Sequence, residues 1–448
     1  SALNISGGTI TATGIEIASG SVMTNTGGTL NISTITNNGG VTFNRTDTLT
    51  FEGAISGSGT TYIDGSTLAL GSGGSLATTT TVNSGGTLAL QSGSSWHNGE
   101  ISINSGGTMR FAGGSGTSSK SLHAYGGTVD VNGQSLAEGT FANFIAQSTG
   151  AKLMNSSSSA ASIAAGNTIW LLGSSAEIQT VGNLQINSAI TSALASSSNG
   201  ITKTGAGTLI LAGANSFTGT TTVNAGTLEV ASGGSISSSA TTINSGGTLD
   251  VNGTAGNITV NDGGLLKGSG TISALSITSG GTLAPGNSTG MMNVGNTSLL
   301  GGGKYVWEID NFGGVAGTNW DFLNVAGDLT ISASSISPFL IDVASLLVSD
   351  DTAGPAAGFN DAMSYTFAIA TASGSISGYG SDVFNINTTG FQNAFTGTWG
   401  TSLSDDGKSL NITYTAATAI PEPSTGILFL SALGILALRQ RGRGTPSR

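Results

Sequence analysis

The chain contains no cysteine, only 6 prolines and few charged side chains, which make up 8% of its 448 residues. The lack of cysteine excludes thiol catalysis, cysteine-based zinc sites and disulfide-linked assembly. A secreted protein of this size can do without disulfides if a long continuous core holds it together. The 73 glycines follow no collagen-like period, and 37% apolar residues are too many for a disordered chain. These absences leave a fold of many short strands with Gly, Asn and Ser at its corners.

Positive charge is also scarce, with 12 Lys and Arg against 23 Asp and Glu. Four of the basic residues lie in the last ten positions, so 22 acidic and 8 basic residues precede Pro421. We do not expect nucleic acid as a partner, because phosphate binding needs a basic face. Acidity of this kind keeps a secreted β-protein soluble and apart from its copies.

The repeat is clearest between Gly200 and Val230, in the segment GITKTGAGTLILAGANSFTGTTTVNAGTLEV. Apolar and polar residues alternate over 208–212, 220–224 and 227–230, which predicts three short strands with one face in a core. Glycines at the intervening corners reach positive φ at little cost. Strands this short bury too little surface alone, so the unit must stack on copies of itself.

Copies of a Gly-Gly-Thr-Leu/Val motif recur on both sides of this stretch. Asn83, Asn104 and Tyr125 are 21 residues apart, and Asn224, Asn244, Asn261 and Thr278 are separated by 20, 17 and 17 residues. A period near twenty with apolar residues two apart is one coil of a β-solenoid. We predict about fifteen coils stacked at ~4.8 Å over residues 1–300, with recurring Asn side chains sharing amide hydrogen bonds along the rod.

The stretch at 200–230 resembles the passenger-associated β-strand repeat of autotransporter-like exported proteins. The resemblance rests on three segments, namely Lys203-Thr204-Gly205-Ala206-Gly207-Thr208-Leu209, Gly213-Ala214-Asn215-Ser216-Phe217-Thr218-Gly219 and Val223-Asn224-Ala225-Gly226-Thr227-Leu228. It implies an all-β chain folded as a right-handed parallel β-helix, with an envelope or extracellular location. It implies nothing specific about chemistry.

The chain opens inside the repeat at Ser1-Ala2-Leu3, with no initiator Met, basic region or apolar region before it. We expect a mature or truncated form of an exported protein whose signal peptide is missing. Between Gln134 and Asn199 the repeat is less regular. There Phe141–Leu153 has helical spacing, which predicts a short helix or a protruding loop. Strand patterning then returns, and the predicted core residues are Ile169, Leu171, Ile178, Val181, Leu184 and Ile186.

The composition changes near residue 300. Of the 26 aromatic residues, 15 lie between Gly301 and Thr418. A solenoid needs an end that covers its open core and its unpaired strand edge. We therefore predict a β-rich C-terminal cap over 301–418, built as widened coils or as a small sandwich. Its expected strands are Lys304–Asp310, Asp321–Ile331, Phe339–Val343, Tyr365–Ala370, Asp382–Ile386 and Ser409–Thr415.

The last thirty residues, 419–448, differ in composition from the rest of the chain and are a separate segment. Pro421-Glu422-Pro423 precedes the apolar segment 426–438, which is followed by Arg439, Arg441 and Arg443. This order resembles the PEP-CTERM sorting signal of Gram-negative-type bacteria. The thirteen apolar residues rise about 20 Å, and residues 418–438 together nearly span a membrane. The resemblance implies a short transmembrane helix inserted transiently in the inner membrane and cleavage by an exosortase-type enzyme at or near Pro-Glu-Pro.

Candidate chemistry is sparse in the rest of the chain. His97 and His123 are the only histidines, no G-x-S-x-G motif accompanies them, and we assign no catalytic residue. Glu308, Asp310, Asp321 and Asp328 are possible calcium ligands, as are the pairs Asp350/Asp351 and Asp405/Asp406. The calcium-binding G-G-x-G-x-D repeat is absent, and we commit to no metal and no cofactor. Trp96, Trp307, Trp320 and Trp399 would stack on sugar rings if exposed, but burial in the cap is favoured for the last three.

The sequence favours an exported, non-enzymatic β-helix protein of the cell surface. Its PEP-CTERM resemblance implies a structural or adhesive role in an exopolysaccharide envelope or biofilm. One alternative is a carbohydrate-active β-helix enzyme, for which two flank carboxylates about 5 to 9 Å apart would argue. The other is an autotransporter passenger, although no C-terminal barrel of alternating strands is evident. A flank of uniform Ser, Thr and Asn would favour the structural role.

Overall fold

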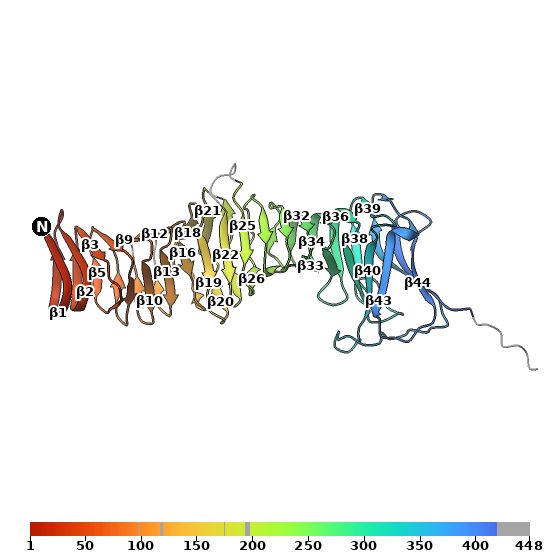
Figure 1. Cartoon of the computed structure of the whole chain (residues 1–448), viewed down its shortest axis with the longest axis horizontal. Coiled ribbons are helices and arrows are strands. Elements are labelled where there is room, and N and C mark those ends of the chain that lie inside the picture. Colours follow the sequence, from red (N-terminus) through yellow and green to blue (C-terminus); the bar gives the residue numbers. More distant parts are fainter. Residues whose placement is uncertain (98, 117–119, 174, 193–197, 419–448) are drawn as a thin grey trace, which may run out of the picture.

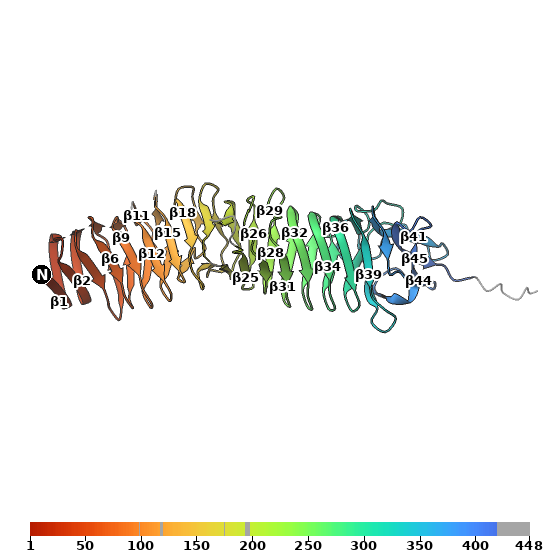
Figure 2. The same cartoon turned by 90° about the horizontal axis from the view of Figure 1, so that it is seen from above.

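The computed structural model describes residues 1–97, 99–116, 120–173, 175–192 and 198–418. These residues form an elongated rod of stacked coils, with the N-terminus at one end and a broader β-rich cap at the other (Figure 1). A view turned by a right angle shows the same straight stack (Figure 2). The prediction of an all-β parallel solenoid is confirmed.

Three sheets run along the rod. The first sheet has 14 strands and spans the N-terminal half of the rod. Its strands are β1 (Ala2–Ile17), β2 (Val22–Asn37), β3 (Gly40–Phe43), β5 (Ala54–Ser56), β6 (Thr60–Ile63), β8 (Ser75–Leu76), β9 (Thr79–Val82), β11 (Ser95–Trp96), β12 (Ile101–Asn104), β14 (Ser115–Gly116), β15 (Leu122–Tyr125), β18 (Asn143–Ala146), β21 (Thr168–Leu171) and β24 (Ile190–Ser192).

The second sheet runs from the third coil to the cap. Its strands are β4 (Thr48–Phe51), β7 (Thr67–Leu70), β10 (Thr87–Gln91), β13 (Thr108–Ala112), β16 (Thr128–Asp130), β19 (Lys152–Asn155), β22 (Ala176–Thr180), β25 (Ile201–Thr204), β27 (Thr221–Val223), β29 (Ser235–Ile236), β30 (Thr241–Ile243), β32 (Thr254–Val260), β34 (Thr271–Ile277), β36 (Met291–Leu300), β38 (Phe322–Val325), β39 (Leu329–Ser332), β41 (Tyr365–Ala372), β42 (Ile376–Ser377), β44 (Thr398–Leu403) and β45 (Ser409–Thr415).

The third sheet has 11 strands and belongs to the C-terminal half. It consists of β17 (Ser135–Leu136), β20 (Ala161–Ile163), β23 (Leu184–Ile186), β26 (Thr208–Leu211), β28 (Gly226–Val230), β31 (Gly247–Val251), β33 (Leu265–Gly268), β35 (Thr282–Pro285), β37 (Lys304–Ile309), β40 (Phe339–Ser345) and β43 (Phe384–Gly390). A 3-10 turn, η1 (Ser381–Val383), precedes β43.

The core consists of columns of like residues in parallel register. In the third sheet Leu209 pairs with Leu228, Leu228 with Leu249, and the column continues through Leu266 to Leu283. All five leucines are fully buried. Each strand thus places one face in the interior, as the alternation predicts. The ten residues that most clearly show this predicted inward face are buried, namely Val82, Leu88, Leu90, Ile101, Ile103, Leu209, Leu211, Val223, Leu228 and Val230.

Glycine is required at the corners because the coils approach closely there. Gly226 has φ of +64°, and a Cβ built on it would lie 2.5 Å from the carbonyl oxygen of Gly205 in the coil before. A side chain here would therefore meet both an unfavourable backbone conformation and a steric clash. The same combination explains why glycine recurs at this place in the repeat.

Two local predictions are wrong. Phe141–Leu153 contains β18 and the start of β19 instead of a helix or a protruding loop, and both strands pair in parallel with the coils on either side. The helical spacing arose because two short strands and their corner follow one another. Val181 is 52% exposed, because the inward alternation of β22 ends at the buried Thr180 and the next residue lies on the outer side of the corner.

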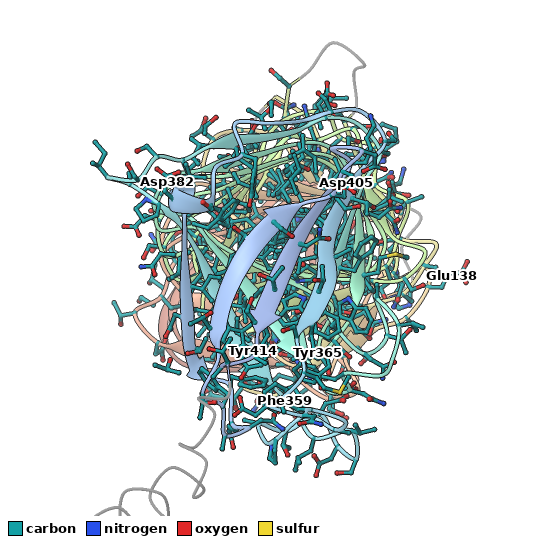
Figure 3. The ribbon with its side chains drawn as sticks, turned by 90° about the vertical axis from the view of Figure 1, so that its right-hand side faces the viewer. Glu138, Phe359, Tyr365, Asp382, Asp405 and Tyr414 are labelled. Atoms are coloured by element: carbon teal, nitrogen blue, oxygen red, sulfur yellow. The ribbon has the colours of Figure 1, made fainter. Side chains whose placement is uncertain are left out.

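Parallel pairing does not stop at residue 300. The column that includes Leu283 continues through Tyr305, Ile341 and Ile386, so the coils run on into the cap and become wider. The stack ends where β45 pairs antiparallel with both β41 and β44. This reversal turns the last strands across the open end of the rod (Figures 1 and 3).

Candidate functional site

The predicted sorting residues Pro421, Glu422, Pro423, Arg439, Arg441 and Arg443 lie outside the described residues, as does the apolar segment 426–438. Within the part of the chain that the structure describes, no helix has the length and apolarity to cross a membrane. The sorting signal therefore stays a prediction from the sequence.

The four cap carboxylates considered for calcium do not all come together. Glu308 and Asp321 are neighbours, and the two carboxylate oxygens of Asp321 accept hydrogen bonds from the backbone N–H groups of Gly290 (2.8 Å) and Glu308 (3.0 Å). Asp310 instead accepts from the Asn319 amide at 3.0 Å. In the described ranges no three His, Cys, Asp or Glu side chains are grouped so as to hold a metal ion.

Burial makes Asp321 and Glu308 unusual. Burial, and then the charge of Glu308, raise the pKa of the Asp321 carboxyl well above its ordinary value. Burial also raises the pKa of Glu308, and the charge of Asp351 adds to the effect. No cation compensates them in the ion pairs that the structure shows. These two carboxylates are a source of pH sensitivity in the cap.

The remaining acidic pairs occupy turns. Asp350 accepts hydrogen bonds from the backbone N–H and hydroxyl of Thr352, which lower the pKa of Asp350. The hydroxyl of Ser404 and the backbone N–H of Lys408 act in the same way on Asp406 and lower its pKa. At the C-terminal end of the rod, Asp405 lies well apart from Asp382 (Figure 3). These carboxylates shape local turns and do not form a shared site.

Three of the four tryptophans considered for sugar stacking are built into the cap. Trp307 is fully buried and donates from Nε1 to the Asp321 carbonyl at 2.9 Å. Trp320 and Trp399 are half-buried and pack against Phe367 and Phe391, with ring centroids 4.9 and 5.1 Å apart. The prediction that the cap buries these three is confirmed for Trp307 and in part for the others. Trp96, outside the cap, is fully buried as well.

Sequence reasoning missed Trp170, which lies on the outer face of β21. Its indole Nε1 donates to Asn143 Oδ1 on β18 at 2.9 Å, so the ring extends back across the preceding coil. The alternation of β21 was the available signal, because Ile169 and Leu171 were expected inside and the residue between them therefore faces out.

Trp170 belongs to a small group that we call the flank patch, on the outer face of the first sheet. Register places Ser102, His123, Ile145 and Trp170 in one row along the rod. The His123 imidazole lies 2.9 Å from Gln147 Oε1 and 3.5 Å from Glu100 Oε1, in the following and preceding coils. It also stacks on Tyr125, with ring centroids 6.0 Å apart. The patch comprises Glu100, His123, Tyr125, Asn143, Ile145, Gln147 and Trp170. The other histidine, His97, is exposed after β11 and has no part in it.

Asparagine ladders form as predicted. Asn104 donates to Asn83 at 2.7 Å, and Asn83 donates to Asp64 at 2.6 Å. A second ladder joins Asn261 to Asn244 and Asn244 to Asn224, at 2.9 and 2.8 Å. Each side-chain amide thus hydrogen-bonds a side chain of the neighbouring coil and helps to fix the register between the two coils. In the next coil, Tyr125 pairs with Asn104 and so stands where the first ladder would continue.

An outer column of the second sheet consists of hydroxyl side chains at all but two positions. The column is Thr48, Thr67, Thr87, Thr108, Thr128, Lys152, Glu177, Thr202, Thr222, Thr242, Thr259, Ser276, Ser298 and Thr330. The single interruption is an ion pair in which Lys152 Nζ lies 3.1 Å from Glu177 Oε2. Apart from this pair the column carries only Thr and Ser, which is the kind of flank expected for a structural role.

One corner holds a buried lysine that the sequence pattern did not reveal. Lys203 stands in a core column between Ile178 and Val223. Its ammonium donates to the carbonyls of Thr204 (2.9 Å), Gly205 (2.8 Å) and Ala225 (3.0 Å). Burial lowers the pKa of Lys203 to about 8. The side chain therefore closes the corner between two coils by hydrogen bonds to the main chain.

A groove of about 860 Å³ opens near the N-terminal end, between β2 and β4. Here coil three has 12 residues from Phe43 to Ala54, two more than the 10 from their partners Asn25 to Thr34 in coil two. Arg45 holds the Asp47 carboxylate with bonds of 2.8 and 2.9 Å and lowers the pKa of Asp47. A general acid needs a raised pKa, so Asp47 is poorly suited to that role in the enzymatic alternative.

The fold defines a parallel β-helix protein, with a mostly hydroxyl outer column on its second sheet and Asn ladders between its coils. Residues 201–230 match the family model described as passenger-associated-transport-repeat, which confirms the resemblance on that stretch. No curated protein matches the chain. Among solved structures, the crystal structure of a TibC-catalysed hyper-glycosylated TibA fragment, residues 55–350, is 19% identical and has a TM-score of 0.22. That match covers 88% of this chain and 99% of the other.

Proposed function

We propose that this chain is an exported, non-enzymatic β-helix protein of the cell surface, where it acts as a structural or adhesive component of an exopolysaccharide envelope or biofilm. The observation that carries the proposal is the outer column of Thr and Ser on the second sheet, in register from Thr48 to Thr330. Apart from Lys152 and Glu177, such a column offers one hydroxyl group per coil, with coils ~4.8 Å apart on a rigid support. The passenger-type repeat at 201–230 supports export to the surface.

Residues 419–448 supply the sorting step of the proposal. Pro421 and Pro423 lack backbone donors and would favour an extended Glu422, which a protease cleft could bind. The arginines Arg439, Arg441 and Arg443 would stop the apolar segment from sliding through the membrane, because moving guanidinium groups across hydrocarbon is costly. An exosortase-type enzyme would then release the rod.

A second candidate is an autotransporter passenger, which the repeat match at 201–230 favours. The two candidates differ in their use of the C-terminus. A sorting signal is consumed on the way to the surface, whereas a passenger needs no Pro-Glu-Pro sequence at all.

The test compares the wild-type chain with a variant in which Pro421-Glu422-Pro423 is replaced by Ala-Ala-Ala. Both carry an epitope tag in the exposed loop at Ile336, which is 95% exposed. The wild type should reach the surface without its C-terminal peptide, and the variant should stay full-length in the membrane fraction. Mass spectrometry of the mature protein provides the measurement. Surface delivery of both forms with Arg448 still attached would contradict sorting and favour the passenger candidate.

The non-enzymatic part has its own assay. The purified chain, incubated with neutral and acidic polysaccharides, should release neither reducing ends nor unsaturated uronates above a heat-denatured control. Turnover that is lost on replacing Asp47 or Glu52 in the groove would overturn this part and support the enzymatic alternative.

A further inference from the structure

We propose that the flank patch on β15, β18 and β21 is a binding site for a neutral polysaccharide chain that runs along the rod. This inference rests on the proposed function and names the surface through which the rod would hold the polymer. It starts from the contrast between this patch and the Ser, Thr and Asn rows around it. Three planar side chains lie on this face, His123 and Tyr125 on β15 and Trp170 two coils further along on β21.

The rings are held in fixed positions by their neighbours. Asn143 holds the Trp170 indole across β18 through a bond of 2.9 Å, and Gln147 holds the His123 imidazole at 2.9 Å. Tyr125 stacks on His123 with an interplanar angle of 14°. A surface whose side chains are already ordered loses little conformational entropy on binding. Planar rings that are already ordered are therefore suited to binding a ligand.

Partial exposure makes the rings available to a ligand. Tyr125 is 38% exposed and Trp170 is half-buried, whereas the His123 side chain, packed against Tyr125, is 17% exposed. The negative face of an aromatic ring attracts the slightly positive C–H face of a sugar ring, and contact between them also buries apolar area. The polar atoms around the rings, from Asn143, Gln147 and Glu100, would then meet the sugar hydroxyls. A few polar groups beside apolar rings are the usual composition of a ligand site.

The geometry of the stack favours a polymer over a single sugar. Trp170 and His123 stand in one row two coils apart, which corresponds to about 10 Å along the rod. A chain of linked sugars lying along this direction would contact the two rings with different residues. Several weak contacts on one chain add up, because each later contact is intramolecular.

Charge selects a neutral polymer. The chain has a formal net charge of −11, and the Glu100 side chain, 48% exposed, stands at the edge of the patch. A uronic-acid polymer would be repelled by this surface and would find no Lys or Arg among the seven residues of the patch. A neutral glucan meets no such barrier.

The experiment is affinity electrophoresis of the full-length chain in native gels that contain a soluble neutral glucan, barley β-glucan or konjac glucomannan. Alginate serves as the acidic polymer. The wild type should be retarded by at least one of the neutral polymers, and its retardation by alginate should be weaker. Trp170→Ala and Tyr125→Ala should each raise the dissociation constant at least fivefold, and Trp170→Phe should restore part of the loss.

Tyr62→Ala is the matched control. Tyr62 is 38% exposed like Tyr125 and lies in the same outer row as His123, but Thr81 and Ser102 separate it from the patch. This variant should bind as the wild type does. Near-identical thermal unfolding of all variants excludes loss of fold as the cause.

Equal retardation of the wild type, Trp170→Ala and Tyr125→Ala would overturn the inference, as would an absence of retardation by both neutral polymers. Stronger binding to alginate would also overturn it. None of these results touches export or C-terminal processing, which the mass spectrometry above measures. The two proposals can therefore fail separately.

Discussion

The rod and the cap are held together in different ways. In the coils of 201–300 columns of like core residues pack on one another about twenty positions apart, as in the column of Leu209, Leu228 and Leu249, and Lys203 is an exception. In the cap the contacts join rings from distant segments, for example Phe312 with Phe391 and Tyr365 with Tyr414. The rod therefore depends on stacking between neighbouring coils, whereas the cap adds to this stacking contacts between rings from distant segments.

The cap cluster reaches the end of the molecule. Phe359, Tyr365 and Tyr414 lie together near one edge of the terminal face (Figure 3). Tyr414 donates its hydroxyl to Asp361, which also accepts from the backbone N–H of Thr396 at 2.8 Å. These bonds, led by the one from Tyr414, lower the pKa of Asp361 to about 2. A short repeated pattern is thus sufficient to specify the rod, whereas the end of the rod requires residues that do not repeat.

The largest expected effect comes from placing a charge in a rod column. Leu228→Asp would leave an unpaired carboxylate between Leu209 and Leu249, at a cost on the order of 5 kcal/mol in the free energy of unfolding. Because coils stabilise their nearest neighbours, hydrogen-exchange protection should fall across 201–260 and recover with distance. Glu229→Asp, on the outer face of the same strand, is the control and should change little. Full protection of these coils in Leu228→Asp would refute the column model.

A smaller loss is expected in the cap from Trp307→Ala. Trp307 is fully buried, contacts Phe367 and Trp399, and donates to the Asp321 carbonyl. Its removal should cost about 3 to 5 kcal/mol. Hydrogen exchange should then show faster opening of 301–418, with coils 201–260 unchanged. If both regions lose protection equally, rod and cap unfold as one unit and the distinction drawn here is wrong. Val315→Ala, in an exposed cap loop, is the matched control.

The smallest effects come from pH, and they have opposite signs in the two regions. Burial lowers the pKa of Lys203 from 10.5 to about 8, so the unfolded chain binds the proton more tightly between these values. Rod stability should therefore rise as pH increases from about 8 to 10.5, by roughly 1 to 2 kcal/mol once solvent screening is considered. Lys203→Met should abolish this slope in denaturant titrations.

In the cap the pKa of Asp321 and that of Glu308 are raised, so the folded state holds these protons more tightly than the unfolded chain. The stabilisation is complete below the ordinary pKa, near 4, and is lost as pH rises through the higher folded values. Glu308→Gln should reduce this slope and stabilise the cap at neutral pH by about 0.5 to 1 kcal/mol, because it removes the like charge beside Asp321. Parallel pH slopes in rod and cap would contradict the assignment.

Much of the rod followed from the sequence alone. The alternation of residues at 208–211 and 226–230 identified the strands, the twenty-residue period identified the coil, and Gly226 identified a corner. These signals can be found in a short stretch of sequence, because a strand in a solenoid usually pairs with a copy of itself in the next coil. The Asn ladders could be predicted for the same reason, since a repeated amide finds its own copy one coil away.

The features that depart from the repeat could be assigned only from the tertiary structure. The pattern of β18 and β19 looks helical until the flanking coils supply parallel partners. Lys203 stands in a core column because three corner carbonyls accept its ammonium protons, which no periodicity reveals. The flank patch depends on side chains from four coils, and the cap on rings as far apart in sequence as Phe312 and Phe391. Repetition lets a short pattern specify its own neighbours, whereas an exception depends on residues that only folding brings into contact.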